Sequence, residues 1–180
     1  QVALKMKALK IDMESIAFGT NAVKNAGAAA TARKMATILT WIGTNDVFGA
    51  TGASPTALDG TALRTDGTQR AFTEALLKSA LQLIWTSGGR PDKIALGGFN
   101  KQQMSTFTGR ATPQENATAK KIVNSVDVYE GDFGTQKVVA SRNMRARDCL
   151  ILQMDMWARA NLRGIGTTEL AKTGDSERKQ

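Results

Sequence analysis

The helix-to-strand segment at residues 73–97 restricts the possible folds more than any other part of the chain. Thr73 is suited to cap a helix, because its hydroxyl can accept a hydrogen bond from a free backbone amide of the first turn. The predicted buried face of this helix consists of Leu76, Ala80, Leu83 and Ile84. The helix is ended by Gly88, Gly89 and Pro91. A short buried strand follows at 93–97, so one strand is expected to lie between two helices in the chain.

A β-hairpin is predicted for residues 126–140. Its strands carry Val126, Val128, Val138 and Val139, and they are separated by a tight turn at Gly131, Asp132, Phe133 and Gly134. A further apolar strand is expected to begin at Cys149, whose thiol is predicted to be buried and unreactive. Because helices dominate the first half and strands the second, we predict an α+β fold.

Three other helices and two connecting segments are predicted from weaker local signals. Residues 2–18 have apolar side chains on more than one side of a helix that ends at Gly19, so we expect two surfaces to contact it. A second helix is expected at 31–42, and a long irregular loop at 44–68. A short helix capped by Asn100 is expected to run to Phe107, followed by a polar connection at 109–120.

The composition excludes several kinds of catalytic site. The 180 residues contain no histidine and one cysteine, which removes Ser-His-Asp and Cys-His catalysis, internal disulfides and multi-cysteine metal sites. Asp127, Glu130 and Asp132 cluster in sequence, but exposed turn acids explain them more simply than a carboxylate hydrolase does. We therefore predict no enzyme, no catalytic residue, no cofactor-binding residue and no metal ligand. No apolar run is long enough to span a bilayer, so no membrane partner is expected.

The net charge of +8 leaves a nucleic-acid partner open. The first 34 residues hold six Lys or Arg against two acids, and residues 137–180 hold nine against five. The bases do not form a run of five, and the aromatic and basic signature of a ribonucleoprotein domain is missing from the sequence. A mildly basic, solvated surface and a weak DNA contact are both compatible with this pattern.

Four segments make the chain resemble tailed-phage major capsid proteins, also called major head proteins, of the podovirus-type group. They read LKMKALKIDMESIAFG, TARKMATILTWIGTN, TEALLKSALQLIWTSGGRPDKIALGGFNKQQMSTFTG, and VDVYEGDFGTQKVVASRNM continuing through ELAKTGDSERKQ. The last two are the most specific, because they hold a long ordered pattern of helix, glycine pair, proline, strand, hairpin and polar tail. The resemblance extends over nearly all of the chain.

The resemblance implies the shell fold shared by tailed phages, encapsulins and herpesvirus capsid floors. Residues 1–25 would be the spine helix of the peripheral domain, residues 26–160 the axial domain, and residues 161–180 a segment returning to the peripheral domain. The family has an arm and an extended loop before the spine helix and further strands after the tail, so we expect this chain to be truncated at both ends. Thr167 to Gln180 would then be a strand of the peripheral sheet.

The implied function is that of a structural subunit that self-assembles, through hexamers and pentamers, into the icosahedral head enclosing phage double-stranded DNA. Its expected partners are other copies of itself, the packaged DNA on the inner face, and scaffolding, portal or decoration proteins. The implied location is the virion, after assembly in the host cytoplasm. Two alternatives remain open from the residues: a basic nucleic-acid-binding module, and the shell of an encapsulin-like compartment.

Overall fold

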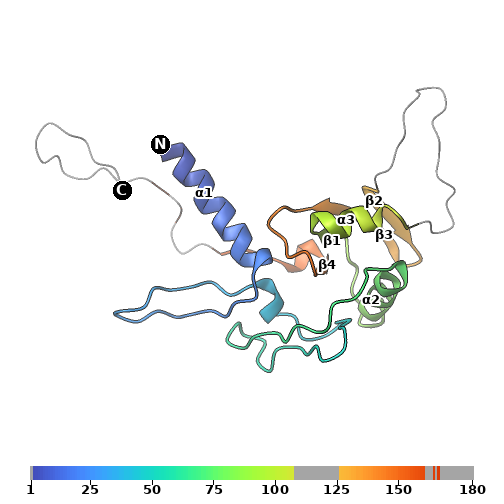
Figure 1. Cartoon of the computed structure of the whole chain (residues 1–180), viewed down its shortest axis with the longest axis horizontal. Helices are drawn as coiled ribbons and strands as arrows, with labels where there is room; N and C mark the ends of the chain where they lie inside the picture. The colour runs from blue at the N-terminus through green and yellow to red at the C-terminus, as the bar shows by residue number, and fades with distance from the viewer. Residues whose placement is uncertain (1, 108–125, 161–163, 165, 167–180) are drawn as a thin grey trace, which may run out of the picture.

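The computed structural model describes residues 2–107 and 126–160 together with Gly164 and Gly166 (Figure 1). The elements are, in chain order, α1 (Val2–Glu14), the π-helical turn η1 (Ser15–Gly19), the 3₁₀ turn η2 (Ile38–Thr40), α2 (Glu74–Thr86), β1 (Lys93–Leu96), α3 (Gly98–Met104), β2 (Val128–Gly131), β3 (Gly134–Ala140), β4 (Cys149–Leu152) and the 3₁₀ turn η4 (Met154–Met156). Helices precede strands, with one strand between two helices, and the predicted α+β fold class is confirmed. The polar connection at 109–120 and the tail from Thr167 lie outside the described residues.

The strands form one mixed sheet in the order β2-β3-β1-β4. β1 runs parallel to β3 and antiparallel to β4, whereas β2 and β3 form the predicted antiparallel hairpin. Gly131 lies opposite Gly134 at the hairpin turn, and Gly134 has a φ of +113°, a backbone conformation that side chains with a Cβ rarely adopt. The sequence-predicted turn is therefore confirmed at its predicted residues.

The sheet buries a different core on each face, because successive side chains of a strand point to opposite sides. On one face, α2 and α3 cover a cluster of Leu77, Leu81, Ile94, Leu96, Met104 and Val138. On the other face, Leu150 and Leu152 of β4 pack with Leu39 of η2 and with Met144. Phe18, in η1, is half-buried against this second cluster and so joins the end of the N-terminal helix to the sheet.

The helix α2 matches its sequence signals closely, although its buried face differs from the predicted one. The Thr73 hydroxyl accepts a hydrogen bond from the Leu76 backbone N–H at 3.4 Å, and Gly88 leaves the helix with a φ of +83°. The fully buried side chains are Leu77 and Leu81, whereas Leu83 is 43% exposed. The prediction that Leu83 is buried is wrong, because the sheet meets the helix along the i, i+4 row of Leu77 and Leu81.

The predicted helix at 31–42 is wrong for most of its length. Residues 31–37 instead pair with residues 22–28 in a narrow two-stranded ribbon. The turn is stabilised where Gly27, at a φ of +83°, donates its N–H to the Asn25 side-chain oxygen at 2.8 Å. Only Ile38–Thr40 forms a helical turn, and it is of the 3₁₀ type. Pairing with a preceding segment has overridden the helical pattern.

Asn100 does not cap a helix. The helix α3 begins at Gly98, after Gly97 as the N-cap residue, and Asn100 is buried in its first turn. Its side-chain amide donates instead to the carbonyl oxygens of Ala146, at 2.9 Å, and Asp148, at 3.2 Å. The long loop predicted at 44–68 is confirmed as a segment without helix or strand, apart from an isolated pairing of Ala53 with Thr65. Across the described part of the chain, no helix has the length and apolar character needed to cross a membrane.

The burial of α2 gives a first prediction. Leu81→Ala should lower the free energy of unfolding by about 2 to 5 kcal/mol, because it leaves a cavity in the core under the sheet. Leu83→Ala is the matched control, since the same atoms are removed from an exposed position of the same helix, and it should change stability by less than about 0.5 kcal/mol. Urea unfolding followed by circular dichroism measures both. Equal losses would contradict the packing described here.

Candidate functional site

The N-terminal helix α1 is almost entirely exposed. None of its thirteen residues is buried, and the exposed fraction is 70% for Leu4, 53% for Ile11 and 49% for Leu9. These apolar side chains are distributed around the helix and alternate with Lys5, Lys7 and Lys10. A helix that is apolar on several sides is stable in water only when other surfaces cover it. The expectation that two surfaces contact this helix is therefore not met by the described part of the chain.

The attachment of α1 to the sheet is confined to its C-terminal end. Phe18 packs on the second core, and its carbonyl accepts a hydrogen bond from the Arg145 backbone N–H at 3.2 Å. The Glu14 carboxylate accepts a hydrogen bond from the Ser141 hydroxyl at 2.7 Å. A Cβ on Gly19 would lie 2.4 Å from the Asn143 carbonyl oxygen, so the chain passes too close there for any larger residue. From this point the helix projects away from the sheet (Figure 1).

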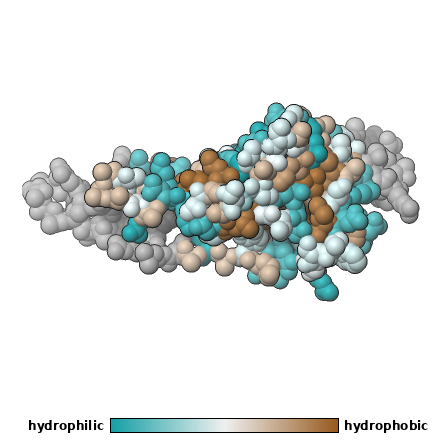
Figure 2. Space-filling model, turned by 90° about the horizontal axis from the view of Figure 1, so that it is seen from below, coloured by the Kyte–Doolittle hydropathy of each residue, from teal (hydrophilic) through white to brown (hydrophobic). Residues whose placement is uncertain are grey.

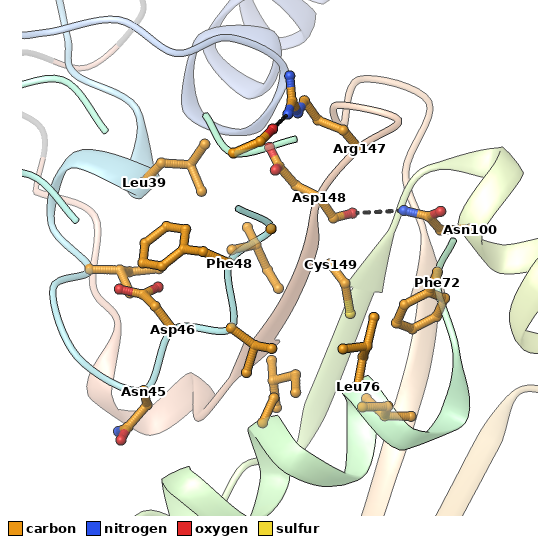
Figure 3. Close-up of a pocket in the computed structure, with 18 of the residues that line it drawn as sticks. Leu39, Asn45, Asp46, Phe48, Phe72, Leu76, Asn100, Arg147, Asp148 and Cys149 are labelled. Carbon is orange, nitrogen blue, oxygen red and sulfur yellow. Dashed lines mark hydrogen bonds between the residues drawn. The ribbon is translucent and has the colours of Figure 1, made fainter. Parts of the chain in front are cut away.

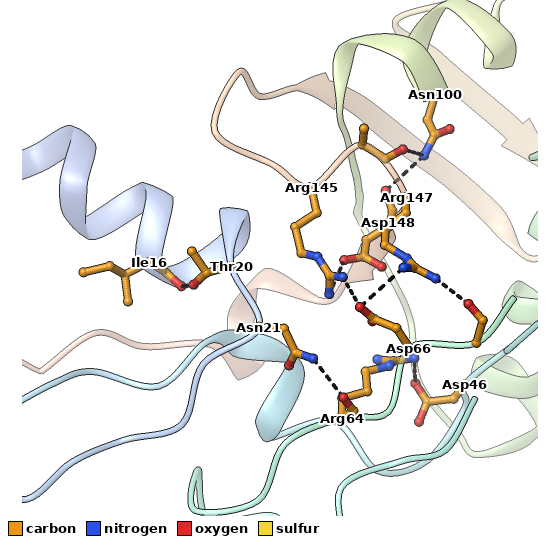
Figure 4. A network of polar contacts seen from close by, with 12 residues as sticks. Ile16, Thr20, Asn21, Asp46, Arg64, Asp66, Asn100, Arg145, Arg147 and Asp148 are labelled. Carbon is orange, nitrogen blue, oxygen red and sulfur yellow. Dashed lines mark hydrogen bonds and ion pairs between the residues drawn. The ribbon is translucent and has the colours of Figure 1, made fainter. Parts of the chain in front are cut away.

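A network of ion pairs connects the long loop to the turn between β3 and β4 (Figure 4). Asp66 of the loop accepts a hydrogen bond from Arg145 and lies 3.5 Å from the guanidinium of Arg147. Arg145 also lies 3.2 Å from Asp148, and Arg147 donates to the Gly67 carbonyl. This is a four-residue charged bridge between segments far apart in the sequence.

A second ion pair holds the loop together internally. Arg64 lies 2.9 Å from Asp46, and both side chains are largely buried, with 14% and 8% exposed. The Arg64 guanidinium also stacks over the Phe48 ring, 4.4 Å from its centroid. The Arg64 carbonyl accepts a hydrogen bond from the Asn21 side chain at 2.8 Å, which connects the loop to the base of the ribbon. The loop therefore has a defined shape without regular secondary structure.

The two aspartates that contact Arg145 are shifted in opposite directions. The hydrogen bond from Arg145 holds the pKa of Asp66 below its ordinary value of 3.8. Burial raises the pKa of Asp148, and it outweighs the attraction of Arg145. The contribution of Asp66 to stability is therefore complete above about pH 3.8 and is lost as the pH falls through its lower folded pKa. Asp148 has the opposite effect on stability. Because burial disfavours its charged form, its raised pKa lowers the free energy of unfolding at higher pH, and this loss disappears as the pH falls to its ordinary pKa.

A groove of about 800 Å³ lies between the loop, α2 and the edge strand β4 (Figure 3). Its floor is the whole of β4, and its apolar walls include Phe48 and Phe72 of the loop side and Leu76 of α2. Asp46, Asp148 and Arg147 lie at its polar margin, already engaged in the ion pairs described above. The groove therefore offers apolar contact area and no convergent set of free polar groups.

The residues with potential chemistry are not brought together. Asp127 forms an ion pair with Lys101 at 3.2 Å and is otherwise exposed, while Glu130 and Asp132 lie exposed on the hairpin. Burial raises the pKa of the Cys149 thiol to about 12, which makes it a poor nucleophile, as predicted. Within residues 2–107 and 126–160, no group of three or more Cys, Asp or Glu side chains is placed to hold a metal ion.

Sequence reasoning missed the charged bridge, because the paired residues are remote from one another in the chain. Arg145 and Asp66 are 79 positions apart, and neither lies in a motif. The only signal is the concentration of charge in the Arg145, Arg147 and Asp148 segment, which suits many surfaces. The apolar side chains on more than one side of α1 were indicated by the sequence, and their contact with other surfaces stays a prediction.

The charged bridge gives a second prediction. Asp66→Asn should weaken the attachment of the loop by about 1 kcal/mol, since a partly exposed ion pair contributes about that much. Amide hydrogen exchange at Thr65 and Thr68, which are hydrogen-bonded within the loop, should then be about fivefold faster. Exchange in α2 should not change. Asp12→Asn, at an exposed position of α1, is the control, and equal effects of both variants would contradict the role assigned to Asp66.

Comparison with known protein families identifies the family of this chain. The SU10 major capsid protein family matches residues 1–180, the whole of the chain. No curated protein matches the chain. The family supports a structural role as a bacteriophage major capsid protein, with association into a shell and a location in the virion capsid. The α+β architecture, in which a helix projects from a body of sheet and helices, agrees with that role. The chain belongs to the SU10 major capsid protein family.

Proposed function

We propose that this chain is the subunit that assembles, through hexamers and pentamers of itself, into an icosahedral head enclosing phage double-stranded DNA. The single observation that carries the proposal is α1, an apolar helix with no buried residue that is attached to the sheet at one end. Such a helix fits a chain whose remaining contacts are made by other copies. The proposed role is structural, and it requires no catalytic residue, cofactor or metal.

The distribution of apolar side chains supports contact with other protein surfaces. Among the described residues, seventeen large hydrophobic side chains are exposed, against eleven hydrophobic side chains that are buried. The face seen in Figure 2 has apolar patches between polar areas. Single exposed hydrophobic residues are normal, but contiguous apolar patches are typical of a surface that is covered on assembly. Repeated contacts between identical copies then give closed symmetric assemblies.

We further propose the domain division that the resemblance implies. Residues 1–25 would be the spine helix of the peripheral domain, residues 26–160 the axial domain, and residues 161–180 the segment returning to the peripheral domain. The projection of α1 from the sheet supports the first of these boundaries (Figure 1). Both cores lie between residues 18 and 152, which supports a compact second domain.

The relationships of the shell are part of the same proposal. The chain would belong with the podovirus-type capsid proteins and share its fold with encapsulins and herpesvirus capsid floors. Assembly would take place in the host cytoplasm, with scaffolding, portal or decoration proteins as additional partners. The phage head is preferred over an encapsulin-like compartment because the matching family is one of phage capsid proteins.

The exposed face of α1 gives the test. In the full-length protein, the double variant Leu4→Gln and Ile11→Gln should reduce the yield of assembled particles at least about tenfold. Burial of these two side chains at a subunit contact contributes on the order of 3 to 6 kcal/mol. Sedimentation velocity and electron microscopy measure the yield and form of the particles.

The control separates assembly from folding. Leu83→Gln changes an exposed leucine on α2 and should leave assembly unchanged. Both variants should unfold at the same urea concentration as the original chain, because none of the three side chains is buried. A full-length protein that remains a single-copy species under every assembly condition would overturn the proposed function. Normal particles from the α1 variant would exclude α1 as the main contact.

A further inference from the structure

The ribbon formed by residues 21–37 is a second projecting element, and its charges are all of one sign. It carries Lys24 on the first strand and Arg33 and Lys34 on the second, without an acidic residue. The absence of acids extends over a longer stretch, since none occurs between Glu14 and Asp46. The ribbon therefore carries positive charge without a compensating acid of its own.

The backbone of the ribbon is regular enough to hold these charges in place. Hydrogen bonds join Ala28 with Thr31 at the tip and Asn25 with Lys34 further down, all at 3.0 to 3.1 Å. Near the base, Thr37 donates its N–H to the Ala22 carbonyl at 3.0 Å. The seven residues of each strand, 22–28 and 31–37, give a length of about 23 Å. Figure 1 shows the ribbon extending away from the sheet and its helices.

The base of the ribbon is anchored, whereas the charges of the second strand are free among the described residues. Lys24 lies 3.4 Å from Asp59 and 5.8 Å from the centre of the Trp41 ring. Arg33 and Lys34 are exposed and form no ion pair within the described chain. Two positive side chains are thus presented on a support that is fixed at one end.

The remaining side chains of the ribbon are unsuited to an apolar protein contact. The first strand and the turn consist largely of small residues, namely Ala22, Ala26, Gly27, Ala28, Ala29 and Ala30. Val23 and Met35 are the only large apolar residues between positions 21 and 37. The ribbon therefore differs from α1, whose leucines and isoleucine favour contact with protein. The cations favour a partner with a polyanionic surface. The small side chains allow the backbone of the ribbon to lie close to that surface.

We infer that the ribbon at residues 21–37 contacts the phosphate backbone of the packaged double-stranded DNA, an inference that rests on the proposed shell function. A two-stranded ribbon fits within the major groove of B-form DNA, and cations on it neutralise the phosphates that flank the groove. The small residues allow the backbone to approach the nucleic acid closely. This contact is independent of base sequence and places the ribbon on the inner side of the shell.

The salt dependence of DNA binding tests the inference directly. The full chain is titrated with a short duplex of mixed sequence at several salt concentrations. The double variant Arg33→Gln and Lys34→Gln should reduce the slope of log K against log salt by about 1.8, since each lost phosphate contact contributes roughly 0.9. The matched control is Arg90→Gln with Lys137→Gln, which removes one arginine and one lysine from exposed positions elsewhere. The control should leave the slope unchanged.

A cross-linking experiment identifies the partner in the particle. Cys149, the only cysteine, is half-buried and lies in the floor of the groove, so it is first replaced by Cys149→Ala, and Ala29→Cys at the ribbon tip then introduces a single thiol for a photoactivated cross-linker. In DNA-filled heads the tip should cross-link to DNA, whereas the same probe at Ala75→Cys, exposed on α2, should not.

Three results would overturn the inference: an unchanged slope for the ribbon variant, an equal change in the control, or cross-links from the tip to protein alone. The last result would identify a neighbouring copy as the partner of the ribbon. The failure of the proposed function is recognised separately, because it is the failure of the original chain to form shells. The salt titration does not depend on shell formation.

Discussion

The packing of β1 between two neighbouring strands is the constraint on which the rest of the described structure depends. β1 pairs with β3 in the parallel direction and with β4 in the antiparallel direction, and its Ile94 and Leu96 are fully buried under α2 and α3. Its Ala95 faces the second core, where Phe18 and Leu39 close the opposite side. A small residue is suited to that position, because the 3₁₀ turn and the end of the N-terminal helix approach the sheet there. The four-residue strand β1 thus packs with α2 and α3 on one face, and with the η2 turn and the end of the N-terminal helix on the other.

Polar contacts hold the long loop, which the apolar packing of the sheet does not fix. The long loop contributes few buried side chains, and it is held to the sheet by Asp66 between Arg145 and Arg147. Asp148 lies close to Arg145 although burial raises its pKa. The surroundings of the bridge therefore favour the charged form of Asp66 and disfavour the charged form of Asp148. Such a bridge contributes modestly to stability but defines where the loop lies. The groove beside it remains as space that the loop does not fill.

The sequence predicted correctly those elements that are determined by residues within the same segment. The α2 helix has its cap, its glycine stop and its proline within one segment, and the β2–β3 hairpin has its turn residues in sequence. The helix predicted at 31–42 was wrong because those residues pair with a segment that precedes them. Asn100 resembles a cap, but two carbonyls nearly fifty positions later bind its amide. The charged bridge has the same origin, since no local pattern relates Asp66 to Arg145. The apolar side chains on several sides of α1 were visible in the sequence, whereas the surfaces that would cover them stay a prediction.

The single attachment point of α1 has a consequence for how copies of one chain can close a shell. In the proposed head, pentamers and hexamers would place identical subunits in surroundings that are not geometrically equivalent, so some part of each subunit would have to tolerate different angles to its neighbours. The π-helical turn at Ser15–Gly19 is a local widening of the helix, a feature often found at sites of function. Because the described contacts of α1 lie at its C-terminal end, around this turn, its direction would be set by what it packs against, while both cores stay unchanged. Curvature of the shell would then be accommodated at one joint near the N-terminus, and the sheet could remain rigid in every copy.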